Sequence, residues 1–469
     1  MRIPKKLVFL WFIPTVLAAL TSCNREFKKA DYTAYFGGEV TNPTSPYVLF
    51  CKDSEVIDTI PLKKDNTFFI KFDSLAPGLY SFKHEPEYQY VYFDKNDSIM
   101  MHLNTKNFDE SIVFCGRGDE KNNFLMEMYL RNETDRSNLF EVFDYDISKF
   151  NKYIDSTHAI TKKYYDSKKE SIAWSDGFDV FAKASLNFPY YSKKELYPLI
   201  HKARTGADVF EKIPKNYYSY RKNIDFNNYE LSGYAPFVMY LSSMLNNMGA
   251  INFHNHYSDV DLALKTNINK LHIADTLIKN EKVKNTILNN IAFMYLLEDQ
   301  NMVNNQKFLN TYYKYSTDKS KKNEIIKIGN AIQLLKVGNK LPDVNLMDIN
   351  GNIISSKALS KKNTVFFFWT ENASSHFLAA HKKAKELKLK YPNYQFVAIN
   401  LDSDQAKWKE ELSKYKFDDI IELRTADFED LKSKWAIMKV HRTIILNNDG
   451  KIGNAFTNLV NVDFEDNLK

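Results

Sequence analysis

The sequence predicts a multidomain protein with an N-terminal antiparallel β-sandwich, an all-α middle region and a C-terminal α/β region. Short apolar runs separated by turn residues, at a spacing of roughly ten residues, fill residues 34–118. Apolar residues then recur every three or four positions through residues 119–336, which is the helical period. Strand and helix patterns alternate in residues 338–469, as in α/β folds.

The N-terminus has the order of a targeting segment. Three basic residues, Arg2, Lys5 and Lys6, precede an apolar stretch over residues 7–20, which is short for a membrane-spanning helix. The following Leu-Thr-Ser-Cys ends at Cys23 and resembles the lipobox of bacterial lipoproteins. The resemblance implies that residues 1–22 are a signal peptide, that Cys23 is lipidated, and that residues 24–33 are a tether. An ordinary secretory signal is the alternative.

The composition argues against a nucleic-acid partner. Without residues 1–22 the chain keeps 61 basic and 58 acidic residues, which is close to neutral, and no basic stripe stands out. No later stretch approaches about 18 uninterrupted apolar residues, so we expect a tethered body rather than a spanning one. Asn24 does not resemble an inner-membrane retention signal. The expected location is therefore the outer membrane on its periplasmic side, with surface exposure as the alternative.

Eight short runs in the first region have β composition and are separated by turn residues such as Asn42-Pro43 and Pro77-Gly78. The predicted strands are 35–37, 47–50, 56–60, 67–72, 79–82, 90–93, 98–101 and 112–114. Cys51 and Cys115 both lie near these patterns. An oxidising periplasm permits a disulfide between them, but two small buried residues are the interpretation we favour, because sequence gives no distance.

Helical periodicity is clearest in three places in the middle region. Apolar positions recur along 147–154, 283–295 and 325–335, each giving one apolar face. Phe188-Pro189, Ile213-Pro214 and Asn247-Met248-Gly249 are the predicted breaks between helices. The frequent aromatic residues predict packing between helices rather than a ligand cage.

The C-terminal region carries a family resemblance. It opens with Gly338-x-x-Leu341-Pro342-Asp343-Val344, ends in an Asn-Asn-Asp-Gly turn at 447–450, and between these has apolar strands at 364–368 and 396–400 around a helix at 375–390. This layout is similar to the TlpA/ResA-like thioredoxin family. The N-terminal β region is similar to the small β-domain that often precedes such a domain in envelope lipoproteins.

The resemblance also shows which chemistry is missing. Ala373 and His376 stand where the family has its two redox cysteines, and His441 stands where it has a cis-proline. Phe367 occupies a strand position where related proteins often carry a buried polar or acidic group. Thiol–disulfide exchange requires a thiolate, so the resemblance implies a redox-inactive domain. A non-proline residue at 441 also predicts a trans peptide and a reshaped loop.

In the thioredoxin fold, His376 and His441 would be neighbours, with Glu371 or Ser374 close by. Two imidazoles and a carboxylate suit zinc or copper, or one histidine could act as a general base. Solvated or partner-facing residues are the alternative, and we expect no cofactor and no catalytic residue. His254 and His256 form a weaker candidate in an Asn-rich segment, and Lys439 and Arg442 predict a small positive patch beside His441.

The sequence thus predicts an envelope-anchored lipoprotein whose thioredoxin-like region binds a protein or another ligand. The expected partners are the membrane, through the lipid on Cys23, and an envelope protein. Two alternatives stay open. One is an enzyme with residual oxidoreductase, histidine-dependent or metal-dependent activity, and the other is a purely structural lipoprotein whose helical region carries the contacts.

Overall fold

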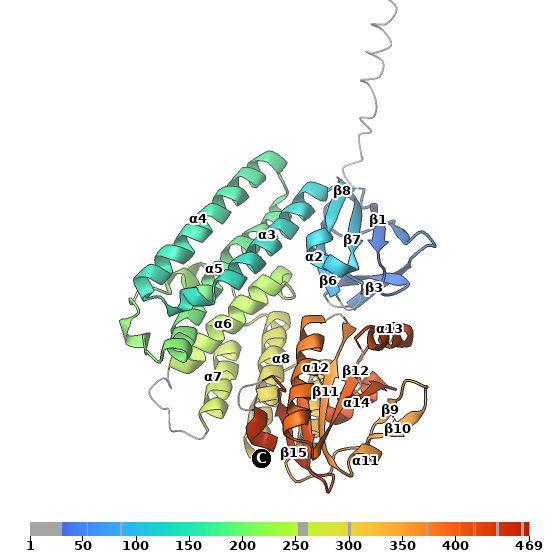
Figure 1. The fold of residues 1–469 in the computed structure, drawn as a ribbon. Helices are drawn as coiled ribbons and strands as arrows, with labels where there is room; N and C mark the ends of the chain where they lie inside the picture. The colour runs from blue at the N-terminus through green and yellow to red at the C-terminus, as the bar shows by residue number, and fades with distance from the viewer. Residues whose placement is uncertain are drawn as a thin grey trace, which may run out of the picture. The chain divides into compact units, whose positions relative to one another are not determined.

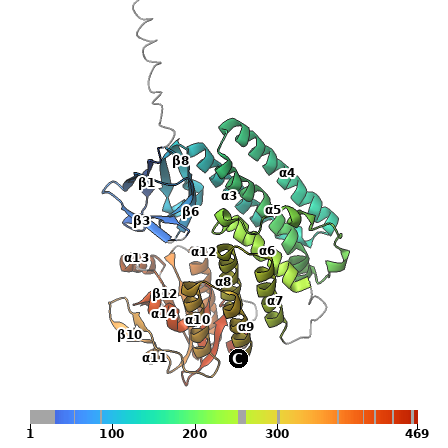
Figure 2. The same ribbon diagram turned by 180° about the vertical axis from the view of Figure 1, so that it is seen from behind.

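The computed structural model describes residues 31–468 except 54, 85–86, 252–260, 299–301, 372–373, 403, 416, 418, 438–439 and 461–463. The chain forms two compact units: one comprises the residues up to Phe140 together with Asp155–Asn187, and the other comprises Glu141–Ile154 together with Phe188–Lys469. The β, helical and α/β regions expected from the sequence are all present (Figure 1, and from behind in Figure 2). The helical region is divided between the two units.

The N-terminal β region consists of two four-stranded sheets. Their orders are β4-β1-β7-β8 and β3-β2-β5-β6. The strands are β1 (Ala34–Thr41), β2 (Tyr47–Lys52), β3 (Glu55–Pro61), β4 (Thr67–Phe72), β5 (Gly78–His84), β6 (Glu87–Phe93), β7 (Ser98–Asn104) and β8 (Val113–Arg117). Each corresponds to one predicted run. The sandwich is not wholly antiparallel, because β1 pairs in parallel with β7.

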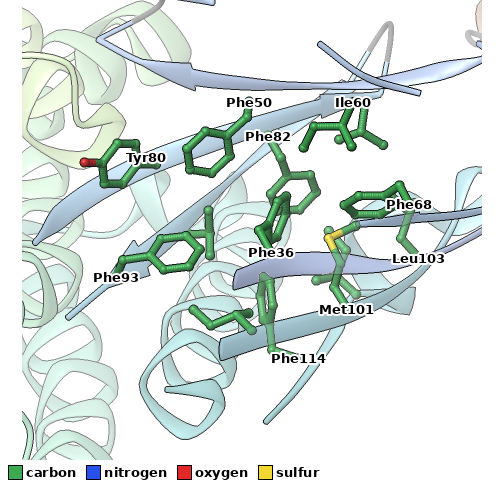
Figure 3. Packing of buried hydrophobic residues seen from close by; sticks show 14 of the residues in the cluster. Phe36, Phe50, Ile60, Phe68, Tyr80, Phe82, Phe93, Met101, Leu103 and Phe114 are labelled. Atoms are coloured by element: carbon green, nitrogen blue, oxygen red, sulfur yellow. The ribbon is translucent and has the colours of Figure 1, made fainter. Parts of the chain in front are cut away.

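Aromatic side chains from both sheets fill the space between them. Phe36 of β1 contacts the rings of Phe50, Phe68, Phe82 and Phe93 at centroid distances between 5.3 and 6.1 Å, and Figure 3 shows this cluster from close by. Burying such rings is the main stabilising contribution to a small β-domain.

Both cysteines of this region are free thiols. Cys51 is buried, as expected, but Cys115 is exposed on the edge strand β8, so the expectation of two buried residues is wrong for Cys115.

Eight long helices follow. They are α3 (Asp119–Asn138), α4 (Ile147–Ile172), α5 (Asp176–Thr205), α6 (Ala235–Ile251), α7 (Leu262–Leu277), α8 (Glu281–Glu298), α9 (Met302–Tyr315) and α10 (Lys319–Leu334). The short helices of the chain up to this point are η1 (Thr105–Asn107), α2 (Phe108–Ser111), η2 (Glu141–Asp144), η3 (Phe210–Lys212), η4 (Ser219–Asn223) and η5 (Tyr229–Leu231). None of the helices in the described part of the chain has the length and apolar character needed to cross a bilayer.

The predicted break at Phe188-Pro189 is wrong, because α5 runs continuously through Pro189. Proline lacks the N–H that would bond the carbonyl four residues earlier, here that of Ser185. The side-chain amide of Asn132 on α3 donates to that carbonyl oxygen at 3.2 Å. A hydrogen bond from a distant helix thus replaces the one that Pro189 cannot make.

The predicted break at Asn247-Met248-Gly249 is also wrong, because α6 continues to Ile251. A Cβ atom at Gly249 would lie 2.8 Å from the Lys270 side chain and 3.3 Å from the Thr266 carbonyl oxygen, both on α7. Glycine therefore stands here because two helices approach closely, and it does not end the helix.

The C-terminal region is built on a seven-stranded sheet of order β10-β9-β13-β12-β11-β14-β15. Its elements are β9 (Asn345–Met347), β10 (Ile353–Ser355), α11 (Ser356–Leu359), β11 (Asn363–Trp369), α12 (Ser374–Lys390), β12 (Tyr394–Asn400), α13 (Gln405–Tyr415), β13 (Ile421–Thr425), α14 (Phe428–Trp435), β14 (Thr443–Leu446), β15 (Ile452–Thr457) and η7 (Phe464–Leu468). β11, β12 and β13 are parallel, and β14 and β15 continue the sheet antiparallel. A parallel core closed by an antiparallel hairpin is the predicted layout.

Strand β11 is buried on both faces, which explains its uninterrupted apolar sequence. Phe367 and Trp369 belong to a core cluster with Phe377 and Ala380 of α12. Phe366, which points to the opposite face, packs against Trp435 of α14 at 5.2 Å between ring centroids. This packing fixes the end of β11 and the start of α12, where the candidate site lies.

Candidate functional site

His376 lies in the first turn of α12, just after β11. The preceding strand ends in Trp369, whose ring stacks on Phe377 with centroids 4.3 Å apart and planes 23° apart. This stacked pair is fully buried and holds the first turn of α12 against the sheet. The position of His376 therefore depends on a rigid aromatic contact.

The structure brings His376 and His441 together from segments 65 residues apart. Their Nδ1 atoms are 3.0 Å apart, and their rings are perpendicular, with centroids 4.3 Å apart. The other nitrogen of His376, Nε2, lies 3.2 Å from the carbonyl oxygen of Phe368. A carbonyl only accepts, so Nε2 carries a proton and Nδ1 of the neutral His376 ring is an acceptor. His441 then donates its Nδ1–H to His376.

Burial of His376 lowers its pKa, and the nearby His441 lowers it further. The hydrogen bonds with the backbone of Phe368 and Val440 act in the opposite direction. The lowered pKa favours the neutral ring of His376, whose Nδ1 accepts the hydrogen bond from His441.

Glu371 does not join this pair. Its backbone N–H donates to Asp402 at 2.8 Å, and its carboxylate lies 4.0 Å from Nζ of Lys407. Burial raises the pKa of Glu371 and that of Asp402. Within the described residues, no group of three or more His, Cys, Asp or Glu side chains is arranged to hold a metal ion. The predicted three-ligand site at His376, His441 and Glu371 stays a prediction.

Arg442 corrects the predicted positive patch. Its side chain is turned inward and is only 8% exposed. Nε donates to the Ala455 carbonyl at 2.8 Å, Nη1 donates to the Ala436 carbonyl, and the guanidinium lies 4.2 Å from the Phe456 ring centroid. Burial lowers the pKa of Arg442 to about 9, which leaves it charged at neutral pH. Arg442 therefore supports the loop that carries His441 from inside.

Sequence reasoning missed an imidazole–carboxyl pair on the same helix. His381 of α12 lies 2.9 Å from Glu422 of β13, and its Nδ1 donates to the Phe377 carbonyl at 2.7 Å. The His381 side chain is fully buried, and that of Glu422 is 12% exposed. Burial raises the pKa of Glu422, while the hydrogen bond and charge of His381 act in the opposite direction.

The sheet register explains how this pair meets the position of Phe367. Phe367, Ala398 and Glu422 lie side by side on three neighbouring strands. The small Ala398 leaves room for His381, whose ring lies 5.1 Å from that of Phe367. Position 367 itself is apolar, and Glu422 places a largely buried carboxyl in register with it from two strands away. A glutamate in register with the buried aromatic strand β11 is the feature that could have indicated the His381–Glu422 pair.

The remaining predicted residues are not in the part of the chain that the structure describes. Ala373, Cys23, His254, His256 and Lys439 fall outside the described residues. The side chain of Ser374 does too.

Comparisons with known proteins agree with the fold. A thioredoxin-like family model matches residues 361–452. No curated protein matches the chain.

Several solved structures are similar to the C-terminal region. A Bacteroides vulgatus protein described as a thiol-disulfide oxidoreductase is 21% identical over 29% of this chain and 96% of its own, with a TM-score of 0.27. A thiol:disulfide interchange protein from a Bacteroides species is 19% identical over 26% and 84%, with a TM-score of 0.22. A secreted Mycobacterium tuberculosis disulfide oxidoreductase is 19% identical over 23% and 78%, with a TM-score of 0.20.

The matched residues span β11 to the start of β15 and include both His376 and His441. The sheet has parallel central strands and an antiparallel closing hairpin, and the model match covers this core. The C-terminal part of the chain is therefore a thioredoxin-like domain.

Proposed function

We propose that this protein is an envelope lipoprotein whose thioredoxin-like domain is a binding module without thiol–disulfide chemistry. The observation that carries the proposal is the contact between His376 and His441 at the redox-motif positions. The three cysteines of the chain are Cys23, Cys51 and Cys115, so residues 338–469 contain none. Without a thiolate nucleophile there is no route to a mixed disulfide.

The proposed contact surface is the loop around His441. His441 is exposed, whereas its neighbour Arg442 is anchored inside the domain by two backbone carbonyls. Because Arg442 fixes the backbone next to the exposed His441, this part of the loop is ordered before a partner binds. Such preorganisation reduces the entropy cost of binding. The proposed partner is an envelope protein, and the proposed membrane attachment is a lipid on Cys23.

Reduction of insulin disulfides by dithiothreitol tests the redox part. We expect the full-length protein to give no acceleration over the uncatalysed rate. The matched control is Ala373→Cys/His376→Cys, which restores two thiols at the family positions and is expected to give a gain in rate. Turnover by the native chain that is lost in Cys51→Ser/Cys115→Ser would instead favour the alternative of residual oxidoreductase activity.

A photoreactive amino acid placed at position 441 tests the binding part in intact cells. We expect one discrete adduct from position 441 and none from position 357, where Lys357 is well exposed on the short helix α11. Equal labelling from both positions would contradict a binding surface at His441 and would favour a purely structural role.

The membrane anchor is tested separately. Metabolic labelling with a fatty acid is expected to label the native chain, and Cys23→Ser is expected to abolish both the label and recovery of the protein with the outer membrane. An unlabelled native chain would favour the ordinary secretory signal.

A further inference from the structure

We propose that His376 and His441 form a two-histidine site for one divalent transition-metal ion, such as Zn²⁺ or Cu²⁺, bound through both Nδ1 atoms. This inference goes beyond the proposed function, because it requires no protein partner. It also differs from the three-ligand site predicted from sequence, because Glu371 takes no part. The argument rests on the spacing of the two nitrogens, the hydrogen bond behind one ring, and the exposure of the other.

The spacing of the nitrogens is close to what a metal ion requires. Two nitrogens that each lie about 2.0–2.1 Å from a tetrahedral Zn²⁺ are about 3.3 Å apart. The two Nδ1 atoms are 3.0 Å apart, so a separation increase of a few tenths of an ångström would admit the ion. A metal ion would take the place of the hydrogen between the rings, and the neutral ring of His441 would carry its proton on Nε2 instead of Nδ1.

The surroundings of His376 match those of a metal ligand. Histidines that bind metals usually donate their second ring N–H to a carbonyl or carboxylate, which fixes the tautomer and the ring orientation. Nε2 of His376 is 3.2 Å from the Phe368 carbonyl oxygen, so its Nδ1 faces His441 as an unprotonated nitrogen that accepts the hydrogen bond from that ring. His376 is thus oriented from behind by the end of β11.

His441 supplies the adjustable half of the site. Its ring is exposed and lies in the loop before β14, so a small rotation to accommodate an ion meets little packing. The backbone of this loop is held by the buried Arg442. One ligand oriented from inside and one exposed ligand allow an ion to enter from solvent.

The donor set indicates the metal class. Imidazole nitrogens suit Zn²⁺, Cu²⁺ and Ni²⁺, and affinity for a given site rises toward Cu²⁺. Since Glu371 is directed to Lys407, the described residues provide two ligands and leave the other coordination positions to water.

Titration of the full-length, chelator-treated protein with Zn²⁺ and separately with Cu²⁺ tests this site. We expect one equivalent of either ion, with the tighter binding for Cu²⁺. His376→Gln and His441→Gln should each weaken this binding by more than about tenfold, since even loss of an outer-shell partner costs 10- to 100-fold. The matched control His254→Gln/His256→Gln removes the other closely spaced histidines of the sequence, and Cys115→Ser removes the exposed thiol. Neither should change the stoichiometry.

The electron paramagnetic resonance spectrum of the Cu²⁺-loaded native protein is a readout that needs no variant. We expect coupling to two equivalent imidazole nitrogens. Absence of stoichiometric binding, or binding that survives His376→Gln/His441→Gln, would overturn the proposal. Because the titration contains no partner, its failure would leave the proposed binding role standing, and failure of the crosslinking experiment would leave this site standing.

Discussion

Helix α12 carries two histidines five residues apart, and their surroundings are opposite. His376 meets the exposed His441 at the surface, whereas His381 meets Glu422 inside the aromatic core. Each pair is joined by one hydrogen bond, but the desolvation cost is larger for the His381–Glu422 pair, whose side chains are more deeply buried. The comparison suggests that His381 and Glu422 determine the stability of the domain, while His376 and His441 contribute little stability and are available for binding.

Glu422→Ala is expected to have the largest effect. It leaves the buried His381 without its hydrogen-bond partner, which costs about 1–3 kcal/mol, and the cavity left by the glutamate side chain adds to this cost. Since a protein with two compact units need not unfold in one step, the measurement is hydrogen exchange of the amides in β11, β12 and β13. The control is His381→Leu/Glu422→Leu, which removes both polar groups and should recover most of the loss. If the double variant were as unstable as Glu422→Ala, the packing of the two side chains, and not their hydrogen bond, would determine stability at this pair.

Arg442→Ala is expected to have the second-largest effect. It removes the donors for the carbonyls of Ala436 and Ala455 and the contact with the Phe456 ring. Hydrogen bonds from a charged group contribute about 1.5–3 kcal/mol, so we expect a loss of about 2–3 kcal/mol in the same exchange measurement. Lys362→Ala, at an exposed position before β11, is the control and should change little. If Arg442→Ala and Lys362→Ala had equal effects on stability, Arg442 would not anchor the loop from inside the domain.

The pH dependence of stability distinguishes the buried pair directly. Burial raises the pKa of Glu422 in the folded protein, so the folded state keeps a proton that the unfolded state releases at about pH 4.3. The contribution of this carboxyl to the free energy of unfolding is therefore fully present below that pH and is lost as the pH rises through the raised value. The loss is about 1.4 kcal/mol for each unit by which the pKa is raised.

Glu422→Gln isolates this contribution, because glutamine does not titrate there. The measurement is the free energy of opening of the β13 amides between pH 4 and 8 in the native chain and in the variant. The free energy of opening of the native chain minus that of Glu422→Gln should decrease as the pH rises. A difference that is constant with pH would contradict a raised pKa at Glu422.

Sequence patterns predicted what depends on local order. The eight strands of the β region follow their own turn residues. The meeting of His376 with His441 is different, because the two residues are 65 positions apart and their contact was expected only from the resemblance to the thioredoxin fold. The Glu422–His381 pair could not be predicted in the same way, because it depends on the register that aligns Phe367, Ala398 and Glu422 across three strands. Helix α5 continues through Pro189 for a similar reason: the compensating donor, Asn132, lies on another helix.

His441→Ala is expected to have the smallest effect on stability, within about 0.5 kcal/mol, because the ring is exposed and its removal opens no cavity. The same substitution should abolish the metal binding proposed for the surface pair. Hydrogen exchange of β14 measures the stability, and Glu422→Ala tested in parallel provides the opposite pattern. If His441→Ala destabilised the domain as much as Glu422→Ala, the surface pair would be structural, and the distinction between the two histidines of α12 would fail. If His441→Ala stays as stable as the native chain but no longer binds the metal ion, binding depends on the surface histidines and not on the packing of the aromatic core.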